Sequence, residues 1–397
     1  MLKQLLAAVL LVGTPALAFQ ASAAPADEAQ RMIDDGLDFL AERQQDDGAW
    51  QPVEQVPPAI TALVLRGMVE KFGPDDPRVL AGYEALLAQQ VADGGIYDDL
   101  LANYNTAIAI SALAAANDDG RFDAEVERAV AYLRKLQWTP ETDPEYAGDN
   151  PGEEGSVSGE DDAFYGGFGY GGRSRGAGRP DLSNLQMALQ ALHDAGISPD
   201  DPAYQRALTF ITRAQNNSET NPAEWAGDDG GFVYGPAADK NYESFAGEYV
   251  TPNGERRLRS YGSMTYAGLK SMIHAGLTKD DPRVAAAYDW VKNNWTLDEN
   301  PGMAERGVEY RDWGLYYYYL TLARALNAYD EPVIDTPNAG PVDWRIAFIE
   351  NAAKLQNDDG SWSGNKKWRE DDPVMVTAYM MIALHEVLDD LEEHPVE

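Results

Sequence analysis

A single carboxylate, Asp181, stands in the stretch RPDLSNLQMAL, directly before an apolar segment. A carboxyl group in this position has two roles open to it. As the N-cap of a helix, it accepts a hydrogen bond from a backbone N–H of the first turn. As a general acid, it donates a proton, which requires an apolar surrounding that keeps the group protonated. The two roles are compatible, and Asp181 is the candidate catalytic residue.

Two arginine clusters flank the apolar segments, and each ends one of the longest loops in the chain. Guanidinium groups bind phosphate and carboxylate through paired hydrogen bonds, so the clusters suggest an anion site, for example for a diphosphate or a phosphorylated lipid. The competing interpretation is that they pair with acidic residues at Glu153, Glu154, Glu160, Asp161 and Asp162. The arginines are Arg173, Arg175 and Arg179 in the first cluster, and Arg256, Arg257 and Arg259 in the second.

Aromatic residues gather near the same segments, and the candidates for lining a pocket are Tyr261, Tyr266, Trp313 and Tyr316. Of the four consecutive tyrosines at 316–319, at most two can face the same side of a helix. Phenol groups on an apolar wall would provide a pocket with polar handles. For most of these residues, packing in the core is the default interpretation.

Several kinds of chemistry are excluded by residue type. The chain has no cysteine, which removes thiolate metal sites and cysteine nucleophiles. His193, His274 and His385 lie near the expected ends of apolar helices, which favours helix-end packing over metal binding. The stretch GFGYGG at 167–172 matches a dinucleotide-binding fingerprint in letters only, because no strand precedes it. We therefore expect no metal and no cofactor.

The composition limits the partners. At 397 residues, with 44% hydrophobic content, the chain can bury a large core. Its formal net charge of −35, from 66 acidic and 31 basic side chains, argues against nucleic acid or an anionic membrane as a partner. After the N-terminal segment, no run of apolar residues is long enough to span a bilayer.

The N-terminal segment has the pattern of an export signal. Lys3 supplies the positive charge, Leu5 to Val12 form a short apolar run, and Ala21 to Ala23 form a small-residue cleavage site. The alternative is a retained amphipathic anchor. We therefore expect residues 1–23 to be a signal peptide, and the mature protein to be periplasmic or secreted.

Six copies of one unit organise the rest of the chain. Each copy begins with an amphipathic helix, continues through a polar loop that contains glycine, and finishes with a more apolar helix. Phrases such as GPDDPRV and TKDDPRV separate units, with Asp as N-cap and Pro in the first helical turn. The first helix of each copy ends near Gln44, Gln90, Gln137, Gln215, Asn294 or Gln356.

Paired helices of this kind form either an open solenoid or a closed ring. A solenoid needs atypical polar units at its ends, whereas the first and last units here match each other best. We therefore predict an all-α fold, an α/α toroid of six helical hairpins with apolar inner and amphipathic outer helices. It forms one domain over 24–397, with long insert loops at 139–179 and 216–259. Strand signals are confined to loops such as 230–235.

Aligning the inner helices identifies Asp181 as unusual. In this register the third unit alone carries a carboxylate at the start of its inner helix. A residue that is not repeated in a repeated fold is a candidate for function rather than architecture. The other five positions in the column are Pro57, Ala102, Tyr261, Leu315 and Pro373.

The repeated glutamine phrase resembles the QW motif of the terpene cyclases and prenyltransferases. That motif combines glycine, an aromatic residue or leucine, glutamine, glycine and tryptophan. The resemblance implies an α/α toroid for the whole mature chain. It also implies that the glutamines and tryptophans are structural and tie a helix end to its loop. The matching residues are Gly36, Leu40, Gln44, Gly48 and Trp50 in the first unit, and Gln356, Gly360 and Trp362 in the last.

The resemblance also implies a place for the acid. Asp181 is similar in position to the aspartate motif of class II terpene cyclases, whose central acid protonates an alkene or epoxide. The family's motif has three aspartates in four positions, whereas residues 179–182 of this chain read Arg-Pro-Asp-Leu. The protein prenyltransferases of this fold bind zinc through Asp, Cys and His, which a chain without cysteine cannot do.

Three hypotheses follow. The first is an exported isomerase, lyase or transferase of the cyclase or prenyltransferase type, acting on an isoprenoid or other apolar ligand with Asp181 as acid. The second is a toroid without catalysis that binds an apolar lipid, or a protein partner at the rim bearing the long loops. The third is a glycan-active enzyme, since six-hairpin toroids also house glycoside hydrolases. Its carboxylates would come from Asp161, Asp162, Glu305, Glu309 and Asp312.

Overall fold

The structure, a computed structural model, describes residues 24–50, 58–98, 100–142, 159–171, 179–236 and 244–396. The expected signal peptide lies outside the described residues. So do Arg173 and Arg175 of the first arginine cluster, and Glu153 and Glu154 of the acidic stretch.

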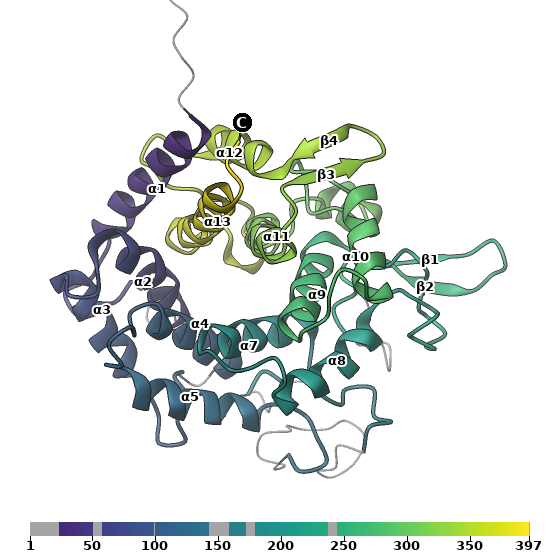
Figure 1. The fold of residues 1–397 in the computed structure, drawn as a ribbon, viewed down its shortest axis with the longest axis horizontal. Coiled ribbons are helices and arrows are strands. Elements are labelled where there is room, and N and C mark those ends of the chain that lie inside the picture. The colour runs from purple at the N-terminus through teal and green to yellow at the C-terminus, as the bar shows by residue number, and fades with distance from the viewer. Residues whose placement is uncertain are drawn as a thin grey trace, which may run out of the picture.

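Two concentric layers of helices form the ring shown in Figure 1. The outer helices are α1 (Pro25–Ala41), α3 (Pro77–Leu87), α5 (Asp123–Lys135), α8 (Pro202–Ala214), α10 (Pro282–Asn293) and α12 (Trp344–Leu355). The inner helices are α2 (Ala59–Phe72), α4 (Ala102–Ala114), α7 (Leu182–Asp194), α9 (Gly262–His274), α11 (Leu315–Tyr329) and α13 (Pro373–Glu393). Each inner helix packs against the next, and α13 packs against α2, which confirms a closed ring of six hairpins.

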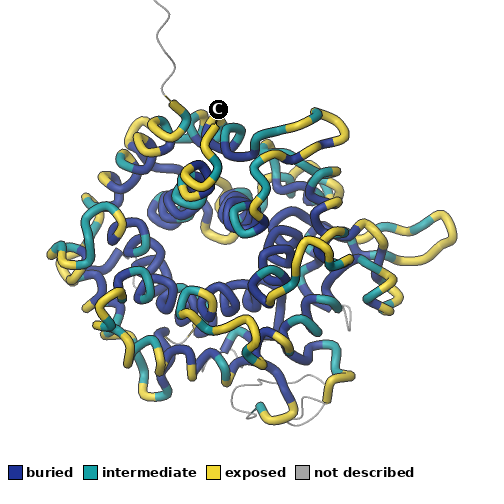
Figure 2. The backbone as a smooth tube through the Cα atoms, viewed as in Figure 1, coloured by how far each residue is buried: buried dark blue, intermediate teal, exposed yellow. Residues whose placement is uncertain are grey.

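Local sequence explains where these helices begin and which side they bury. Asp76, Asp201 and Asp281 each cap an outer helix that starts with proline, and each side chain accepts the N–H two residues further on. The outer helices bury one face, whereas the inner helices are buried over most of their length, as Figure 2 shows. The inner layer is therefore the core of the molecule.

Strands are short and lie outside the helical layers. β1 (Glu248–Val250) pairs antiparallel with β2 (Arg256–Leu258), in a hairpin of the second insert loop that extends away from the ring (Figure 1). β3 (Val333–Thr336) pairs with β4 (Gly340–Asp343) between α11 and α12. The strand signal at 230–235 corresponds to one isolated bridge, between Gln215 and Phe232.

Three short 3₁₀ turns complete the described elements. They span Met303–Glu305, Val308–Tyr310 and Lys367–Arg369, in the loops that precede α11 and α13. Among the residues described, no helix is both long and apolar enough to cross a membrane.

The same hydrogen-bonded joint recurs where five outer helices end. In each joint, the amide group of a glutamine donates to the carbonyl of a glycine in its own loop and to a carbonyl of the next outer helix, at 2.7–3.2 Å. Neighbouring units are thereby tied together, because a single amide group bonds both to its own loop and to the next outer helix. The glutamines are Gln44, Gln90, Gln137, Gln215 and Gln356, and their glycine partners are Gly48, Gly94, Gly166, Gly230 and Gly360.

Glycine is required in this joint for two reasons. All five glycines have φ between +80° and +98°, where other residues are strained. In addition, a Cβ at Gly48 would lie 2.4 Å from the carbonyl oxygen of Ala81 on the next outer helix. The loop backbone at Gly48 therefore lies in direct contact with the next outer helix, and only glycine leaves room for this contact.

The tryptophans that follow the glycines are structural as well. Trp50 and Trp362 are fully buried, and their indole N–H groups donate to the carbonyls of Leu40 and Ala352, at 2.7 and 3.0 Å. These carbonyls lie in the last turns of α1 and α12, so each indole fixes the end of its helix against the loop that follows.

Candidate functional site

Asp181 is the N-cap of α7 and is fully buried. Its Oδ1 accepts the backbone N–H of Asn184 at 2.8 Å, and its Oδ2 accepts the side-chain amide of the same residue at 2.7 Å. The capping role is therefore real. It leaves a carboxyl group completely withdrawn from solvent at the start of an inner helix.

Burial decides the ionisation of Asp181. Desolvation disfavours the carboxylate and raises the pKa of Asp181 to about 6, although hydrogen bonds from Asn184 and from the Tyr234 phenol act in the opposite direction. The Tyr234 hydroxyl also bonds to the hydroxyl of Tyr170. A protonated carboxyl group is thus accessible near neutral pH beside two phenols.

Both long insert loops deliver a tyrosine to this place. The backbone carbonyl of Tyr234 accepts the N–H of Leu182 at 2.7 Å, and that of Tyr170 accepts the N–H of Asn103 at 2.8 Å. These N–H groups belong to the first turns of α7 and α4, which lack helical partners. The insertions therefore rest on the starts of two inner helices and hold their phenols next to Asp181.

A chain of aromatic rings leads from Tyr234 to the surface. Tyr234 packs on Phe245 with centroids 4.9 Å apart, and Phe245 packs on Trp368 at 5.2 Å. Trp368 is 42% exposed and lies 5.8 Å from Trp313. Lys367 lies over the Trp313 ring at 4.3 Å. Apolar surface thus continues from the rim of the ring to the buried carboxyl group.

A second buried carboxyl group, Glu370, lies at the start of α11. Its Oε1 accepts the N–H of Tyr317 at 2.8 Å, while its Oε2 has no hydrogen-bond partner among the described residues. Burial raises the pKa of Glu370 to about 8, against the lowering effect of backbone N–H groups at 315–317. Glu370 is therefore largely protonated at neutral pH.

Tyr317 forms a bridge across the middle of the ring. Its hydroxyl lies 2.6 Å from Oγ of Ser183 and accepts the amide of Gln186 at 2.8 Å, and Tyr104 donates to the same Ser183 oxygen at 2.6 Å. Ser183 is on α7 and Tyr317 on α11, and α9 stands between these helices in the ring. The bond consequently spans the lumen rather than a helix–helix contact.

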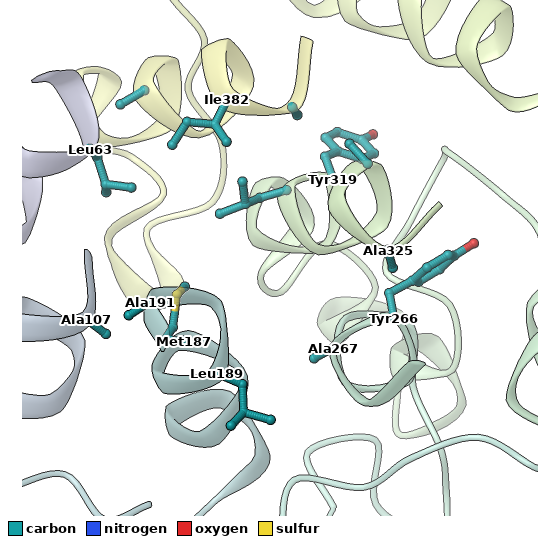
Figure 3. Packing of buried hydrophobic residues seen from close by; sticks show 14 of the residues in the cluster. Leu63, Ala107, Met187, Leu189, Ala191, Tyr266, Ala267, Tyr319, Ala325 and Ile382 are labelled. Atoms are coloured by element: carbon teal, nitrogen blue, oxygen red, sulfur yellow. The ribbon is translucent and has the colours of Figure 1, made fainter. Parts of the chain in front are cut away.

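A small cavity occupies the lumen, lined by residues from α2, α4, α7, α11 and α13. Leu63, Met187 and Ile382 contribute to its apolar wall and come from three of these helices (Figure 3). Its volume is about 10 Å³, and a pocket of about 340 Å³ lies beside Glu70 and Arg121. Asp181 lines neither of these two cavities.

The described arginines of the two clusters do not converge on Asp181 as one anion site. Arg256 pairs with Glu248 and Arg257 with Glu255, both on the projecting hairpin. Arg259 pairs with Glu305 at 3.6 Å. Arg179 lies over the ring of Phe164 at 5.3 Å. Pairing with acids was the competing interpretation for these arginines, although the acids in question are not those expected.

The register of the inner helices needs one correction. Asp372 caps α13 and accepts the N–H groups of Val374 and Met375, so the sixth unit also carries a carboxylate at the start of its inner helix. The statement that the third unit alone does so is wrong. The expected position was the proline after Asp372, which lies one residue beyond the observed cap. The observed caps are Pro58, Leu101, Asp181, Tyr261, Gly314 and Asp372.

The aromatic candidates divide between the site and the helix packing. Tyr261 is the N-cap of α9 and packs on Phe245 at 6.5 Å, near Asp181. Tyr266 packs on Tyr318 at 5.6 Å, within the layer between inner and outer helices. Tyr316 packs against Tyr319 at 5.6 Å. The tyrosine that enters the lumen is its neighbour, Tyr317, which the sequence did not single out.

The three candidate histidines contact other side chains of the ring. His193 and His274 stack at 4.2 Å between centroids, and His385 bonds to Glu70 at 2.8 Å. One described group has ligand atoms close enough to share an ion, and it consists of Asp330, Glu393 and His394 on the surface. Within it, His394 already bonds to Asp330 at 2.6 Å.

Solved structures with similar rings come from more than one kind of protein. The type II terpene cyclase MstE from Scytonema, in its apo form, matches with a TM-score of 0.54 at 14% identity, over 92% of this chain and 99% of that one. The chain has the toroid fold of that cyclase. An inactive variant of the α-1,6-mannanase GH76A of Salegentibacter sp. HEL1_6 matches this terpene-cyclase-like toroid with a TM-score of 0.51 at 10% identity, over 92% and 100% of the chains. No family model and no curated protein matches.

Proposed function

We propose that the chain is a toroid enzyme that protonates an apolar, isoprenoid-type substrate at an alkene or epoxide, with Asp181 as the acid. The observation that carries this proposal is the buried Asp181 carboxyl group, whose pKa lies near 6, held beside Tyr170 and Tyr234. A strong proton donor of this kind needs an uncharged starting state in a place without water.

The chemistry requires only groups that the chain supplies. The proton leaves a carboxyl oxygen of Asp181 and forms a C–H bond at an alkene, or an O–H bond at an epoxide, and a carbocation and a carboxylate result. An internal double bond then attacks the cation, which closes a ring and moves the positive charge to a new carbon. The final cation loses a neighbouring proton to the Asp181 carboxylate, which leaves an alkene and restores the acid. The faces of Tyr261, Phe245 and Trp368 offer electron-rich surfaces that stabilise positive charge.

The solved relatives of this fold support the substrate class. The structure of a variant of MstE is known in complex with geranylgeranyl dihydroxybenzoate as substrate, on a ring of similar extent. The aromatic chain from Trp368 to Tyr234 offers the same kind of apolar surface here. We infer an elongated apolar substrate that enters from the rim that carries the long loops.

A toroid that binds an apolar ligand without catalysis is the second candidate. Two observations favour it: both Asp181 oxygens are already bonded to Asn184, and neither described cavity reaches Asp181. The same aromatic surface would then serve binding alone.

The test compares Asp181→Asn with Asp372→Asn. Both aspartates cap inner helices, and asparagine caps equally well. At position 181 the new amide replaces the oxygen that accepts from Nδ2 of Asn184. The Asn184 amide must therefore turn over and present its Oδ1, which has no partner among the described residues, as the acceptor. Both variants should therefore fold. Each is incubated with geranylgeranyl dihydroxybenzoate and with squalene, and the products are analysed by mass spectrometry.

The proposal expects cyclised product from the wild type and Asp372→Asn, and none from Asp181→Asn. Equal turnover by all three proteins would exclude Asp181 as the acid. If no protein turns over either substrate but all retain the same co-purified lipid, binding without catalysis is supported instead.

We also propose that the protein is exported, on the basis of the pattern in residues 1–23. The mass of the mature protein after expression in a bacterial host tests this. Cleavage after Ala23 with accumulation outside the cytoplasm is the expected result, and an intact N-terminus on soluble cytoplasmic protein would contradict it.

A further inference from the structure

Three hydroxyl groups meet in the lumen, on the first turns of three inner helices. They belong to Tyr104 of α4, Ser183 of α7 and Tyr317 of α11. Tyr104 donates to Oγ of Ser183 at 2.6 Å, and the hydroxyl oxygens of Ser183 and Tyr317 are also 2.6 Å apart. Ser183 follows Asp181 by two residues, so this hydroxyl cluster is adjacent to the proposed acid. The proposed function assigns no role to it.

A buried amide group adds one more hydrogen bond to the hydroxyl cluster. Lys270 on α9 is buried and donates to Oε1 of Gln186 at 2.8 Å, which fixes the orientation of that amide. The amide nitrogen of Gln186 then faces Tyr317 and donates to its hydroxyl oxygen, also at 2.8 Å. Gln186 is therefore a donor to the cluster and does not accept a hydrogen from it.

A count of hydrogens shows that the hydroxyl cluster has one to spare. Its three hydroxyl groups carry three hydrogens. One makes the bond from Tyr104 to Ser183, and a second makes the bond between Ser183 and Tyr317, whichever oxygen donates. In the part of the chain that the structure describes, no acceptor bonds to the third hydrogen, which belongs to Ser183 or Tyr317.

The tyrosines between the two helical layers differ in this respect. Tyr318 and Tyr319, the next residues of α11, donate to the backbone carbonyls of Thr296 and Leu297, at 2.7 and 2.6 Å. Buried hydroxyl groups normally end on an acceptor of this kind. The spare O–H of the hydroxyl cluster therefore calls for an acceptor that is not part of the protein.

Tyr317 is the member of the cluster that can present the spare hydrogen to a ligand. Ser183 is buried, whereas Tyr317 and Tyr104 keep partly accessible surface although they stand on inner helices. Because the Tyr317 hydroxyl crosses from α11 to α7, this surface faces the lumen. One turn further along the same faces of α4, α7 and α11, the lumen cavity is lined by Ile108, Met187 and Leu320.

Both phenols of the cluster keep their hydrogens near neutral pH. Burial raises the pKa of Tyr104 and of Tyr317, and the nearby charge of Asp181 acts in the same direction. The spare hydrogen is therefore a hydrogen-bond donor rather than an acid, and Asp181 remains the proton source of the proposed reaction.

We propose that Tyr317 donates a hydrogen bond to an oxygen atom of the ligand, so that the toroid prefers an isoprenoid chain with a carbonyl, ether, epoxide or hydroxyl oxygen to a hydrocarbon. This rests on the proposed function only for the isoprenoid-type character of the ligand. An oxygen lone pair satisfies the spare O–H of the cluster. A hydrocarbon covers the same O–H and leaves it without a partner, which costs binding free energy.

A competition experiment tests this preference without requiring turnover. Farnesylacetone, a ketone, is offered to the protein together with the hydrocarbon in which a methylene group replaces the carbonyl oxygen. The retained compounds are extracted and quantified by mass spectrometry. The wild type should retain the ketone about tenfold more strongly, as expected for one buried hydrogen bond. Equal retention of the two compounds, or retention of neither, would overturn the proposal. Because binding is measured, the result does not depend on whether Asp181 acts as an acid.

Tyr317→Phe and Tyr318→Phe separate the donor from the fold. Both variants remove one phenol hydroxyl from α11 and keep the aromatic ring, so both should fold, which circular dichroism checks. Tyr317→Phe should lose the preference for the ketone. Tyr318→Phe, whose hydroxyl bonds to Thr296 between the layers, should retain it. A tenfold preference that persists in Tyr317→Phe, or an equal loss in both variants, would contradict the role of Tyr317.

Discussion

Gln356 donates its side-chain amide to the carbonyl oxygen of Met32, 3.1 Å away in space and 324 residues earlier in the chain. The bond belongs to the same joint that connects the other units, and here it connects the last unit to the first. Ring closure is thus made by the element that repeats around the ring.

Replacing Gln356 by alanine should weaken this closure. The change removes the bonds to Met32 and Gly360, and we expect a loss of about 1–3 kcal/mol in the free energy of unfolding. Denaturation in urea measures it. Gln30→Ala, on the exposed side of α1, is the control and should change stability by less than about 0.5 kcal/mol. Equal effects would mean that the joint is not a source of stability.

The glycine of the joint should tolerate no side chain. Gly48 and Gly73 have similar φ values, +89° and +79°, but a Cβ would lie 2.4 Å from the oxygen of Ala81 at Gly48 and would meet nothing within 4 Å at Gly73. Gly73, with ψ of 163°, lies in a region essentially restricted to glycine, so Gly73→Ala should cost about 1–3 kcal/mol for the backbone alone. Gly48→Ala should cost about 1–3 kcal/mol more, because the contact is added. Denaturation curves that coincide would remove the steric argument.

Glu370 should make stability depend on pH. Its folded pKa, about 8, is raised, so its contribution is present when it is protonated and is lost as the pH rises toward that value. Glu370→Gln keeps an oxygen for the N–H of Tyr317 but cannot ionise. We expect the wild type to lose up to about 1.4 kcal/mol per pH unit relative to the variant, from about pH 5 to about pH 8. Parallel stability curves for the two proteins would contradict this.

The proposed activity should follow the protonation of Asp181. Turnover needs the acid form, so the rate should fall about tenfold per pH unit above about pH 6. The Tyr234 hydrogen bond lowers the pKa of Asp181, and Tyr234→Phe should therefore move the profile to higher pH. Tyr83→Phe, whose hydroxyl bonds to Ala112 elsewhere, should leave the profile in place. A shift of the Tyr234→Phe profile to lower pH would exclude the assigned role.

The architecture could be predicted from the sequence because local sequence patterns specify each helix of the fold. Periodic apolar residues, Asp-Pro starts and repeated glutamines each specify one helix or its end. Two of the glutamine joints, however, could be predicted only in part from the sequence. In the third and fourth units the long insertions separate Gln137 from Gly166 and Gln215 from Gly230. A pattern that depends on fixed spacing does not reveal glycines displaced in this way.

The site was less predictable, because its contacts join helices that are distant in sequence. Asp181 was identified by its position before an apolar helix. By contrast, the choice between Tyr316 and Tyr317 depends on the rotation of α11 within the ring, which four consecutive tyrosines do not specify. For Lys270, the sequence of its helix itself indicates a buried base. It is a lysine within an otherwise uncharged, buried helix, GSMTYAGLKSMI.

Because the joint between the last and first units is the same as the others, the ring has no unit that must come first. α1 packs against both α12 and α13. A short linker could therefore connect the end of α13 to the start of α1, while new termini open in the loop between α7 and α8. Such a circular permutant would keep every glutamine joint and both long loops intact. The order in which the ribosome makes the units would change, and the folded ring would not.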